Sequence, residues 1–226
     1  MAPSYSGRFS DRSEAGRALA ERLLQIHLPA PIVVFALPRG GVPVGAEVAR
    51  ALGALLDLVL VRKIGAAWQP EVAVAAVAEG EPPEVVVEEA VRDATGTDRA
   101  DIESRAQVEL TEIARRRRVY LRGRPPVDVE GRTAIVVDDG IATGTTMRAA
   151  LKALRRRRPA LLVLAVPVAP HDTLDALRGE VDRVVCLAQP HPFHAVGLHY
   201  VDFHQVSDAE VIAALEGVSR TERGSC

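Results

Sequence analysis

The sequence predicts an α/β fold built on a doubly wound, mainly parallel sheet. Short runs of apolar, largely β-branched residues, typical of fully buried strands, recur along the chain. Between them lie stretches with helical spacing, such as Met147, Ala150, Leu151 and Leu154. Alternating strands and helices favour parallel pairing, because each helix carries the chain back across the sheet. The 226 residues, 48% hydrophobic and 4% aromatic, suit one large domain, residues 1–226, with an aliphatic core.

The N-terminal half begins with an expected helix. Asp11 and Glu14 give a start signal, and the residues after them form an apolar face at Ala15, Leu19, Leu23 and Ile26. Residues 1–9 show no pattern and are expected to form a loose arm. Strands are predicted at Ile32–Ala36, Leu58–Val61 and Val72–Ala78.

Residues 84–125 are expected to form a helical insertion. Glu84–Glu88 predicts a short strand, and Thr97–Tyr120 predicts a long charged helix with a narrow apolar stripe. Further strands are predicted at 134–137, 160–166 and 184–187. Residues 189–226 are expected to form a C-terminal hood and a last helix, which begins with a capping box of Ser207 and Glu210.

The stretch that follows Ala134–Val137 carries the clearest chemistry. Two carboxylates, Asp138 and Asp139, stand at the end of this apolar run, and a loop of small and hydroxyl residues comes next. The loop residues are Ala142, Thr143, Gly144, Thr145 and Thr146. Backbone N–H groups of such a loop, together with the N-terminus of the following helix, attract an anion. Because carboxylates accept hydrogen bonds from vicinal ribose hydroxyls, the pattern predicts a site for a phosphorylated sugar.

Two other segments place cations after predicted strands. Arg39, with Gly40 and Gly41, follows the first strand, and Lys63 follows the second. A guanidinium binds phosphate oxygens bidentately, and consecutive glycines free the backbone N–H groups to turn towards a ligand. The carboxyl ends of parallel strands border the crevice in which α/β sheets bind ligands, so these cations are expected beside the Asp pair, Asp138 and Asp139.

Residues 134–147 resemble the PRPP-binding signature of type I phosphoribosyltransferases, and residues 38–41 resemble the pyrophosphate loop of that family. The resemblance implies that the Asp pair holds the ribose hydroxyls and helps to bind Mg²⁺, directly or through water. It implies that residues 142–146 hold the 5′-phosphate, and that Arg39, Gly40, Gly41 and Lys63 hold pyrophosphate. The implied catalytic residues are Asp138, Asp139 and Lys63, under a mobile lid at residues 65–70.

The order of the motifs also resembles a group of bacterial phosphoribosyltransferases with no settled acceptor. The shared pieces are Pro-Arg-Gly-Gly, Arg-Lys-Ile-Gly, Asp-Asp-Gly-Ile-Ala-Thr-Gly and the Phe-rich tail. Gly140 departs from the wider family, which usually has a bulkier aliphatic residue there. The implied enzyme is a Mg-dependent glycosyltransferase of nucleotide metabolism that transfers the 5-phosphoribosyl group of PRPP to a base or other nitrogen acceptor.

Two questions stay open at this point. Phe193, Tyr200 and Asp202 are candidates for contact with the acceptor, but the aromatic side chains would equally serve as the core of the hood. A non-catalytic sensor of PRPP or nucleotides is the alternative function, favoured only by the arginine runs 115–118 and 155–158. The first run also leaves room for a polyanionic substrate, a partner subunit or RNA.

The composition bears on which classes of partner are expected: nucleic acid, membrane, metal or small molecule. A net charge of −2 gives no general affinity for nucleic acid, which is therefore not an expected partner. No apolar run suggests a membrane span, and Cys186 and Cys226 do not suggest a disulfide, so a cytoplasmic protein is expected. The histidines of the tail match no closed zinc pattern. PRPP and a small-molecule acceptor are the expected partners, and a homodimer is an open expectation.

Overall fold

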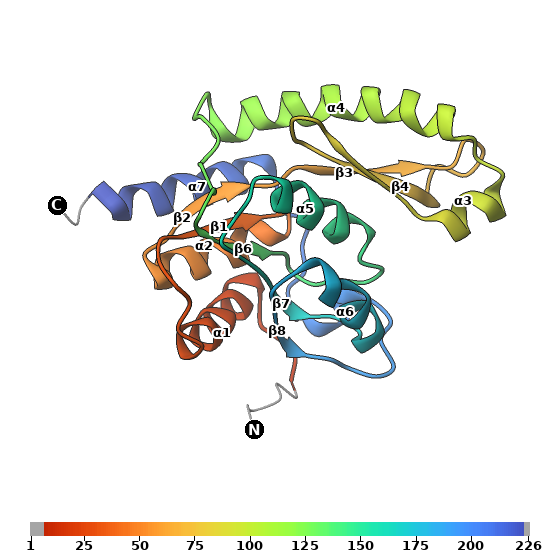
Figure 1. Cartoon of the computed structure of the whole chain (residues 1–226). Helices are drawn as coiled ribbons and strands as arrows, with labels where there is room; N and C mark the ends of the chain where they lie inside the picture. The colour runs from red at the N-terminus through yellow and green to blue at the C-terminus, as the bar shows by residue number, and fades with distance from the viewer. Residues whose placement is uncertain (1–6, 224–226) are drawn as a thin grey trace.

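A five-stranded parallel sheet forms the centre of the molecule (Figure 1). The computed structural model describes residues 7–223, with side chains up to residue 218. The strand order is β2–β1–β6–β7–β8. The strands are β1 (Ile32–Ala36), β2 (Leu55–Leu58), β6 (Thr133–Val137), β7 (Leu161–Val168) and β8 (Arg183–Ala188). The predicted α/β fold with a parallel sheet is confirmed.

Helices cover both faces of this sheet, which explains why its strands are mainly apolar. Val34 and Ala36 of β1 pack in one cluster with residues of α1 (Arg12–Gln25), α2 (Gly41–Leu52) and α7 (Asp208–Arg223). The alternate residues Val33 and Phe35 pack in another cluster with α5 (Thr145–Arg156) and α6 (His171–Leu177). No helix within residues 7–223 combines the length and the apolar character needed to cross a membrane.

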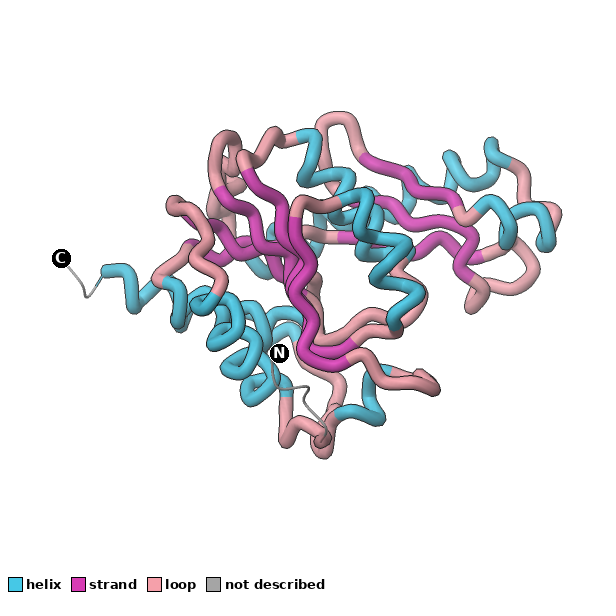
Figure 2. The backbone as a smooth tube through the Cα atoms, turned by 60° about the horizontal axis from the view of Figure 1, so that its bottom comes forward, coloured by secondary structure: helices cyan, strands magenta, loops and turns pink. Residues whose placement is uncertain are grey.

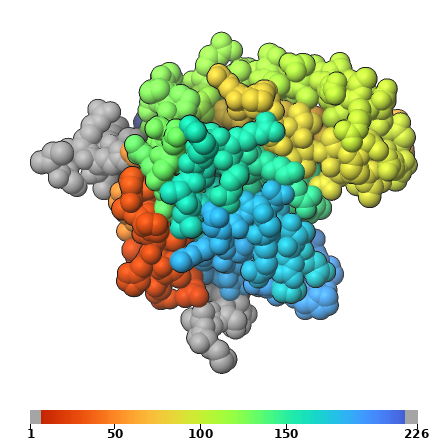
Figure 3. Space-filling model, viewed as in Figure 1, coloured from red at the N-terminus to blue at the C-terminus, as the bar shows by residue number. Residues whose placement is uncertain are grey.

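A second sheet, which is antiparallel, stands apart from the first (Figure 2). Its strands are β3 (Val61–Gly65), β4 (Ala73–Ala78) and β5 (Glu84–Val87), and it is followed by α3 (Glu89–Thr95) and α4 (Arg99–Leu121). The space-filling view shows this part, coloured yellow to lime, as a lobe that projects from the main body (Figure 3). Both helices fall within the expected insertion, residues 84–125, whereas the sheet beside them begins at Val61.

The strand predicted at Leu58–Val61 is wrong. The chain leaves the parallel sheet after Leu58 and enters the antiparallel sheet at Val61. Val59 and Leu60, between the two strands, are both 3% exposed, so the run is apolar and buried throughout. A continuous apolar run carries no periodicity that would mark the break between two strands.

The expected loose arm is also wrong for Phe9, which is 1% exposed. Phe9 forms a parallel bridge with Tyr200, its N–H donates to the carbonyl of His199 at 2.9 Å, and its carbonyl accepts from Val201 at 2.8 Å. Residues 1–6 lie outside the described part of the chain. Pairing with a segment so distant in sequence leaves no local pattern that would have predicted it.

Local start signals were more informative. The carboxylate of Asp11 accepts from the N–H of Glu14 at 2.7 Å at the start of α1. Ser207 and Glu210 form the expected reciprocal bonds before α7, with Glu210 N–H donating to Ser207 Oγ at 3.2 Å and Ser207 N–H donating to Glu210 at 2.8 Å. Side chains that satisfy the free N–H groups of a helix end therefore fix both boundaries.

Candidate active site

The Asp pair lies at the carboxyl end of β6, in the middle of the parallel sheet. The N–H of Asp139 donates to Oδ1 of Asp138 at 2.9 Å. The second carboxylate is only 13% exposed and accepts from Nε of Arg12 at 2.8 Å. The two carboxylates are therefore held in different ways, one by the backbone beside it and the other by a cation from a distant helix.

The loop Gly40–Gly41 packs directly against the Asp pair. A Cβ atom on Gly40 would lie 2.1 Å from Oδ2 of Asp139, and a Cβ atom on Gly41 would lie 2.8 Å from the carbonyl oxygen of Val137. Neither distance leaves room for a side chain. The structure thus brings together the two segments that the sequence placed in one site, and their close approach accounts for two consecutive glycines.

Burial raises the pKa of Asp138 well above 3.8, and repulsion from Asp139 raises it further. The charges of Arg12 and Lys63 oppose this rise in the pKa of Asp138, which places both cations near the Asp pair. Burial also raises the pKa of Asp139, against the hydrogen bond and charge of Arg12. The pair therefore favours cations and hydrogen-bond donors as ligands.

Lys63 reaches this site from an unexpected element. It lies within β3, not at the end of a parallel strand, and its side chain is exposed. The antiparallel sheet therefore supplies the cation that the sequence assigned to the main sheet. Arg39, the other predicted cation, is 31% exposed and lies 3.6 Å from a carboxylate oxygen of Asp208 in α7.

The predicted phosphate loop ends where α5 begins. Gly144 has φ +83°, a conformation that glycine adopts readily, and a Cβ atom there would lie 2.9 Å from Cγ2 of Thr173. Thr173 also donates to the carbonyl of Ala142 at 2.8 Å. Ala142 and Thr143 are exposed, whereas Gly144 and Thr145 are buried, so the loop meets solvent just before the N-terminus of a 12-residue helix. This is the geometry that attracts an anion.

Gly140 is explained by the hood. A Cβ atom on this residue would lie 2.6 Å from Cγ1 of Val196 and 2.9 Å from Cγ1 of Val168. The space that an aliphatic side chain would fill is thus occupied by Val196. The departure of Gly140 from the family pattern is compensated by a hood residue, and the turn is closely packed.

Of the two roles left open for Tyr200, the structure favours the core of the hood, because the side chain is fully buried. Tyr200 is fully buried between the rings of Phe9 and Phe203, with centroid distances of 5.5 and 5.1 Å. Its hydroxyl donates to the backbone carbonyl of Asp139 at 2.5 Å. Burial raises the pKa of Tyr200, which therefore stays protonated and able to donate.

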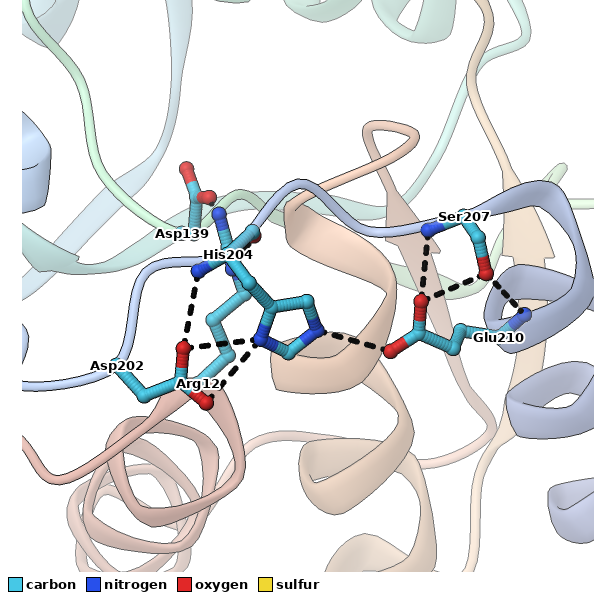
Figure 4. Close-up of polar contacts among 6 residues, drawn as sticks. All are labelled: Arg12, Asp139, Asp202, His204, Ser207 and Glu210. Carbon is cyan, nitrogen blue, oxygen red and sulfur yellow. Dashed lines mark hydrogen bonds and ion pairs between the residues drawn. The ribbon is translucent and has the colours of Figure 1, made fainter.

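The other two acceptor candidates already have partners. The ring of Phe193 stacks on His199, with centroids 5.5 Å apart. Asp202 is exposed and accepts from His204, an interaction that lowers the pKa of Asp202 (Figure 4). His204 also contacts Glu210 at 2.9 Å, and these two carboxylates raise the pKa of His204. Asp202 and Phe193 thus brace the hood.

Arg12 is a site residue that sequence reasoning missed. It lies at the start of α1, is 8% exposed, and points towards Asp139 beside the hood residue His204 (Figure 4). A cation in the first helical turn faces the positive end of the helix dipole, an unfavourable position that was an available signal of another role. A cavity of about 370 Å³ opens beside it. The cavity is lined by Arg12, Arg39, Gly40, Asp139, Phe203, His204, Gln205 and Val206.

Asp138 and Asp139 are the residues of this site that would hold Mg²⁺. Within residues 7–223, no group of three or more histidine, cysteine, aspartate or glutamate side chains is arranged to hold a metal ion. Two buried carboxylates with raised pKa values are nonetheless present side by side. Mg²⁺ commonly takes one or two carboxylates and completes its shell with substrate oxygens and water.

Comparison with known proteins identifies the family of this fold. The model of the phosphoribosyl transferase domain matches residues 11–202, a span that includes the Asp pair, both glycine loops and Lys63. The chain belongs to the phosphoribosyl transferase family. Type I members of this family have the architecture described above, and the resemblance seen in the sequence is confirmed.

Three relatives illustrate the similarity. Two candidate phosphoribosyl transferases of Mycobacterium tuberculosis, from strains CDC 1551 and H37Rv, are each 45% identical over 212 residues, which is 94% of this chain. The chain spans about half the length, 47%, of these curated relatives. TT1426 from Thermus thermophilus, known from a crystal structure, is 44% identical in sequence and matches with a TM-score of 0.77. The match covers 92% of this chain and 97% of the TT1426 chain. None of these names specifies an acceptor.

Proposed function

We propose that this phosphoribosyltransferase transfers the 5-phosphoribosyl group of PRPP to a nitrogen acceptor and releases pyrophosphate. The observation that carries the proposal is the contact between the Gly40–Gly41 loop and the Asp pair. One site thus offers carboxylates for a ribose, a glycine loop with Arg39 for a diphosphate, and a helix N-terminus for a phosphate. PRPP has these three parts in one molecule.

Each part of PRPP is bound by a different group of residues. Ala142, Thr143, Gly144, Thr145 and Thr146 bind the 5′-phosphate at the N-terminus of α5. Asp138 and Asp139 accept hydrogen bonds from the ribose hydroxyls. Arg39, the N–H groups of Gly40 and Gly41, and Lys63 neutralise the pyrophosphate.

Asp138 and Asp139 would hold Mg²⁺, directly or through water. When bound, Mg²⁺ would neutralise the charge of the leaving pyrophosphate. The side chains of this chain then have three tasks. They fix the sugar, stabilise the charge that leaves, and exclude water from a C1 atom that becomes electron-poor. No protein nucleophile is required. A lid at residues 65–70, a cytoplasmic location and a homodimer stay predictions.

The sensor alternative loses the feature that favoured it. Arg115 and Arg116 both pair with Glu112, at 2.7 Å. Further residues of the two runs have intramolecular partners as well: Arg117 with Glu79, Arg155 with Asp182, Arg156 with Glu84 and Arg158 with Glu130. Charges paired in this way are weak evidence for a nucleic acid or a regulatory partner.

The test is a pyrophosphate-release assay with PRPP, Mg²⁺ and a panel of purine, pyrimidine, nicotinate-like and amine acceptors. We expect release with at least one acceptor. The double substitution Asp138→Asn, Asp139→Asn is expected to abolish release without unfolding the chain, because asparagine keeps the shape and removes the charge. Asp172→Asn, at an exposed position of α6, is the control. Normal release by the double variant would overturn the proposal, and PRPP binding without release for any acceptor would favour the sensor.

A further inference from the structure

The start of the described chain and the hood form one unit through main-chain hydrogen bonds. Phe9 donates to His199 and accepts from Val201, and the N–H of Asp202 donates to the carbonyl of Ser10 at 2.9 Å. The chain then enters α1, whose first residue is Arg12. The position of Arg12 is therefore set by the hood as much as by its own helix.

Arg12 makes three contacts in three directions. Its Nε donates to Oδ2 of Asp139 at 2.8 Å, and its Nη1 donates to the carbonyl of His204 at 2.9 Å. Its guanidinium carbon lies 4.0 Å from the centre of the Phe203 ring. Such a cation is held by an ion pair, a hydrogen bond and a cation–π contact at once. The side chain is 9% exposed, which leaves it little freedom to move.

Asp139 is consequently held from two sides. Arg12 holds its carboxylate, and the hydroxyl of Tyr200 holds its backbone carbonyl. Both partners belong to the unit formed by the chain start and the hood. On the third side, Gly40 leaves no space between its backbone and Oδ2 of Asp139. The orientation of this carboxylate thus depends on residues that lie far from β6 in sequence.

We propose that Arg12 is a positioning residue, which orients Asp139 for the ribose of PRPP and couples the hood to the ribose site. This inference rests on the proposed function for the identity of the ligand. Arg12 acts through Asp139, so its effect is larger on a ligand that carries the ribose than on pyrophosphate alone, to which Asp139 would contribute only through Mg²⁺. Lysine cannot replace it fully, because an ammonium group lacks the planar fork that reaches two acceptors at fixed angles.

The experiment compares Arg12→Gln, Arg12→Lys and the control Arg17→Gln, an exposed residue of the same helix. Calorimetric titration with PRPP and, separately, with inorganic pyrophosphate gives two dissociation constants for each full-length variant in Mg²⁺. We expect Arg12→Gln to weaken PRPP binding by about tenfold to a hundredfold, the effect of a misplaced ligand contact. We expect its pyrophosphate affinity to fall by less than about fivefold, which is under about 1 kcal/mol and clearly less than the loss for PRPP.

Other outcomes would overturn the proposal. Equal loss of PRPP and pyrophosphate affinity would mean that Arg12 binds the diphosphate directly. A lower melting temperature with unchanged PRPP affinity would mean a purely structural role. Arg12→Lys is expected to recover part of the PRPP affinity, and it carries the test if Arg12→Gln does not fold. Complete recovery by lysine would refute the requirement for the guanidinium fork.

A stability measurement separates this proposal from the proposed function. If the wild-type protein binds neither PRPP nor pyrophosphate, the proposed function fails, but the coupling between hood and Asp pair can still be measured. The melting temperatures of Arg12→Gln, Asp139→Asn and the double variant are then compared. We expect the double variant to lose clearly less than the sum of the single losses, because both substitutions remove the same interaction. Additive losses would overturn the coupling itself.

Discussion

Replacement of Gly40 by alanine tests the contact on which the proposed site depends. The new Cβ atom would lie 2.1 Å from Oδ2 and 2.7 Å from Cγ of Asp139. Ordinary contact for such an atom begins at 3.4 Å, so the loop and the carboxylate must separate by about 1.3 Å, the difference between these two distances. Overpacking of this kind costs about 1–3 kcal/mol. A displacement of about 1 Å at a reacting centre costs about a hundredfold in rate.

The assay has two parts, a thermal melt and the kcat/KM for pyrophosphate release. For a chain of this length, each kcal/mol lowers the melting temperature by about 2–4 °C, so we expect a loss of about 2–12 °C for Gly40→Ala. We expect kcat/KM to fall by about a hundredfold. Gly179→Ala is the matched control, because a Cβ atom there meets nothing within 4 Å. If Gly40→Ala behaves like this control in both measurements, the loop does not pack against the Asp pair as described.

Three further predictions concern stability. Asp138→Asn is expected to melt at a higher temperature than the wild type at neutral pH. Burial raises the pKa of Asp138, so its carboxyl group stabilises the fold while it is protonated, at pH values below 3.8. This contribution is lost as the pH rises through the raised pKa, whereas asparagine never becomes charged. Melts from pH 3 to pH 8 check this, and an equal difference at every pH would contradict it. Gly140→Ala is expected to lower the free energy of unfolding by about 1–3 kcal/mol. Adding Val196→Ala is expected to restore part of this loss, because the second substitution removes the side-chain atom nearest to the new Cβ. Additive losses in urea unfolding would contradict the packing argument. Asp57→Ala is expected to cost about 1–3 kcal/mol, because Asp57 is 2% exposed and its carboxylate accepts from the N–H of Val127 at 2.9 Å, which would lose this partner. A melt unchanged from wild type would show that this hydrogen bond contributes nothing.

The parallel sheet and the Asp-pair loop were predictable because their signals are local. Apolar runs mark β1, β6 and β7, and each is a strand in the structure. The acidic pair, the small-residue loop and the helical spacing after it occupy consecutive positions, so their order in the sequence fixes their order in space. The capping residues Asp11 and Ser207 located two helix starts for the same reason.

The rest of the site was not predictable because it depends on contacts between distant segments. The sequence suggested three acceptor candidates in the tail, Phe193, Tyr200 and Asp202, but not that Tyr200 would be buried against Phe9. Nor does any local pattern show that the chain changes sheets at Val61, since the apolar run continues unbroken. The unfavourable place of Arg12 in the first turn of α1 signals some other role, but only the fold shows that its partner is Asp139. Residues whose role is created by tertiary packing are therefore the ones that sequence reasoning omitted.

The contacts of Arg12 have a consequence for synthesis of the protein on the ribosome. They join residues that are 127 and 192 positions apart, to Asp139 and to the carbonyl of His204. During synthesis Arg12 therefore leaves the ribosome before either partner, and it forms these contacts only after Asp139 and then the hood have emerged. Nascent chains that stop before the hood contain the phosphate loop and the Asp pair but lack the contacts that fix Asp139. If the proposed function holds, such truncated chains are expected to bind PRPP more weakly than the whole domain.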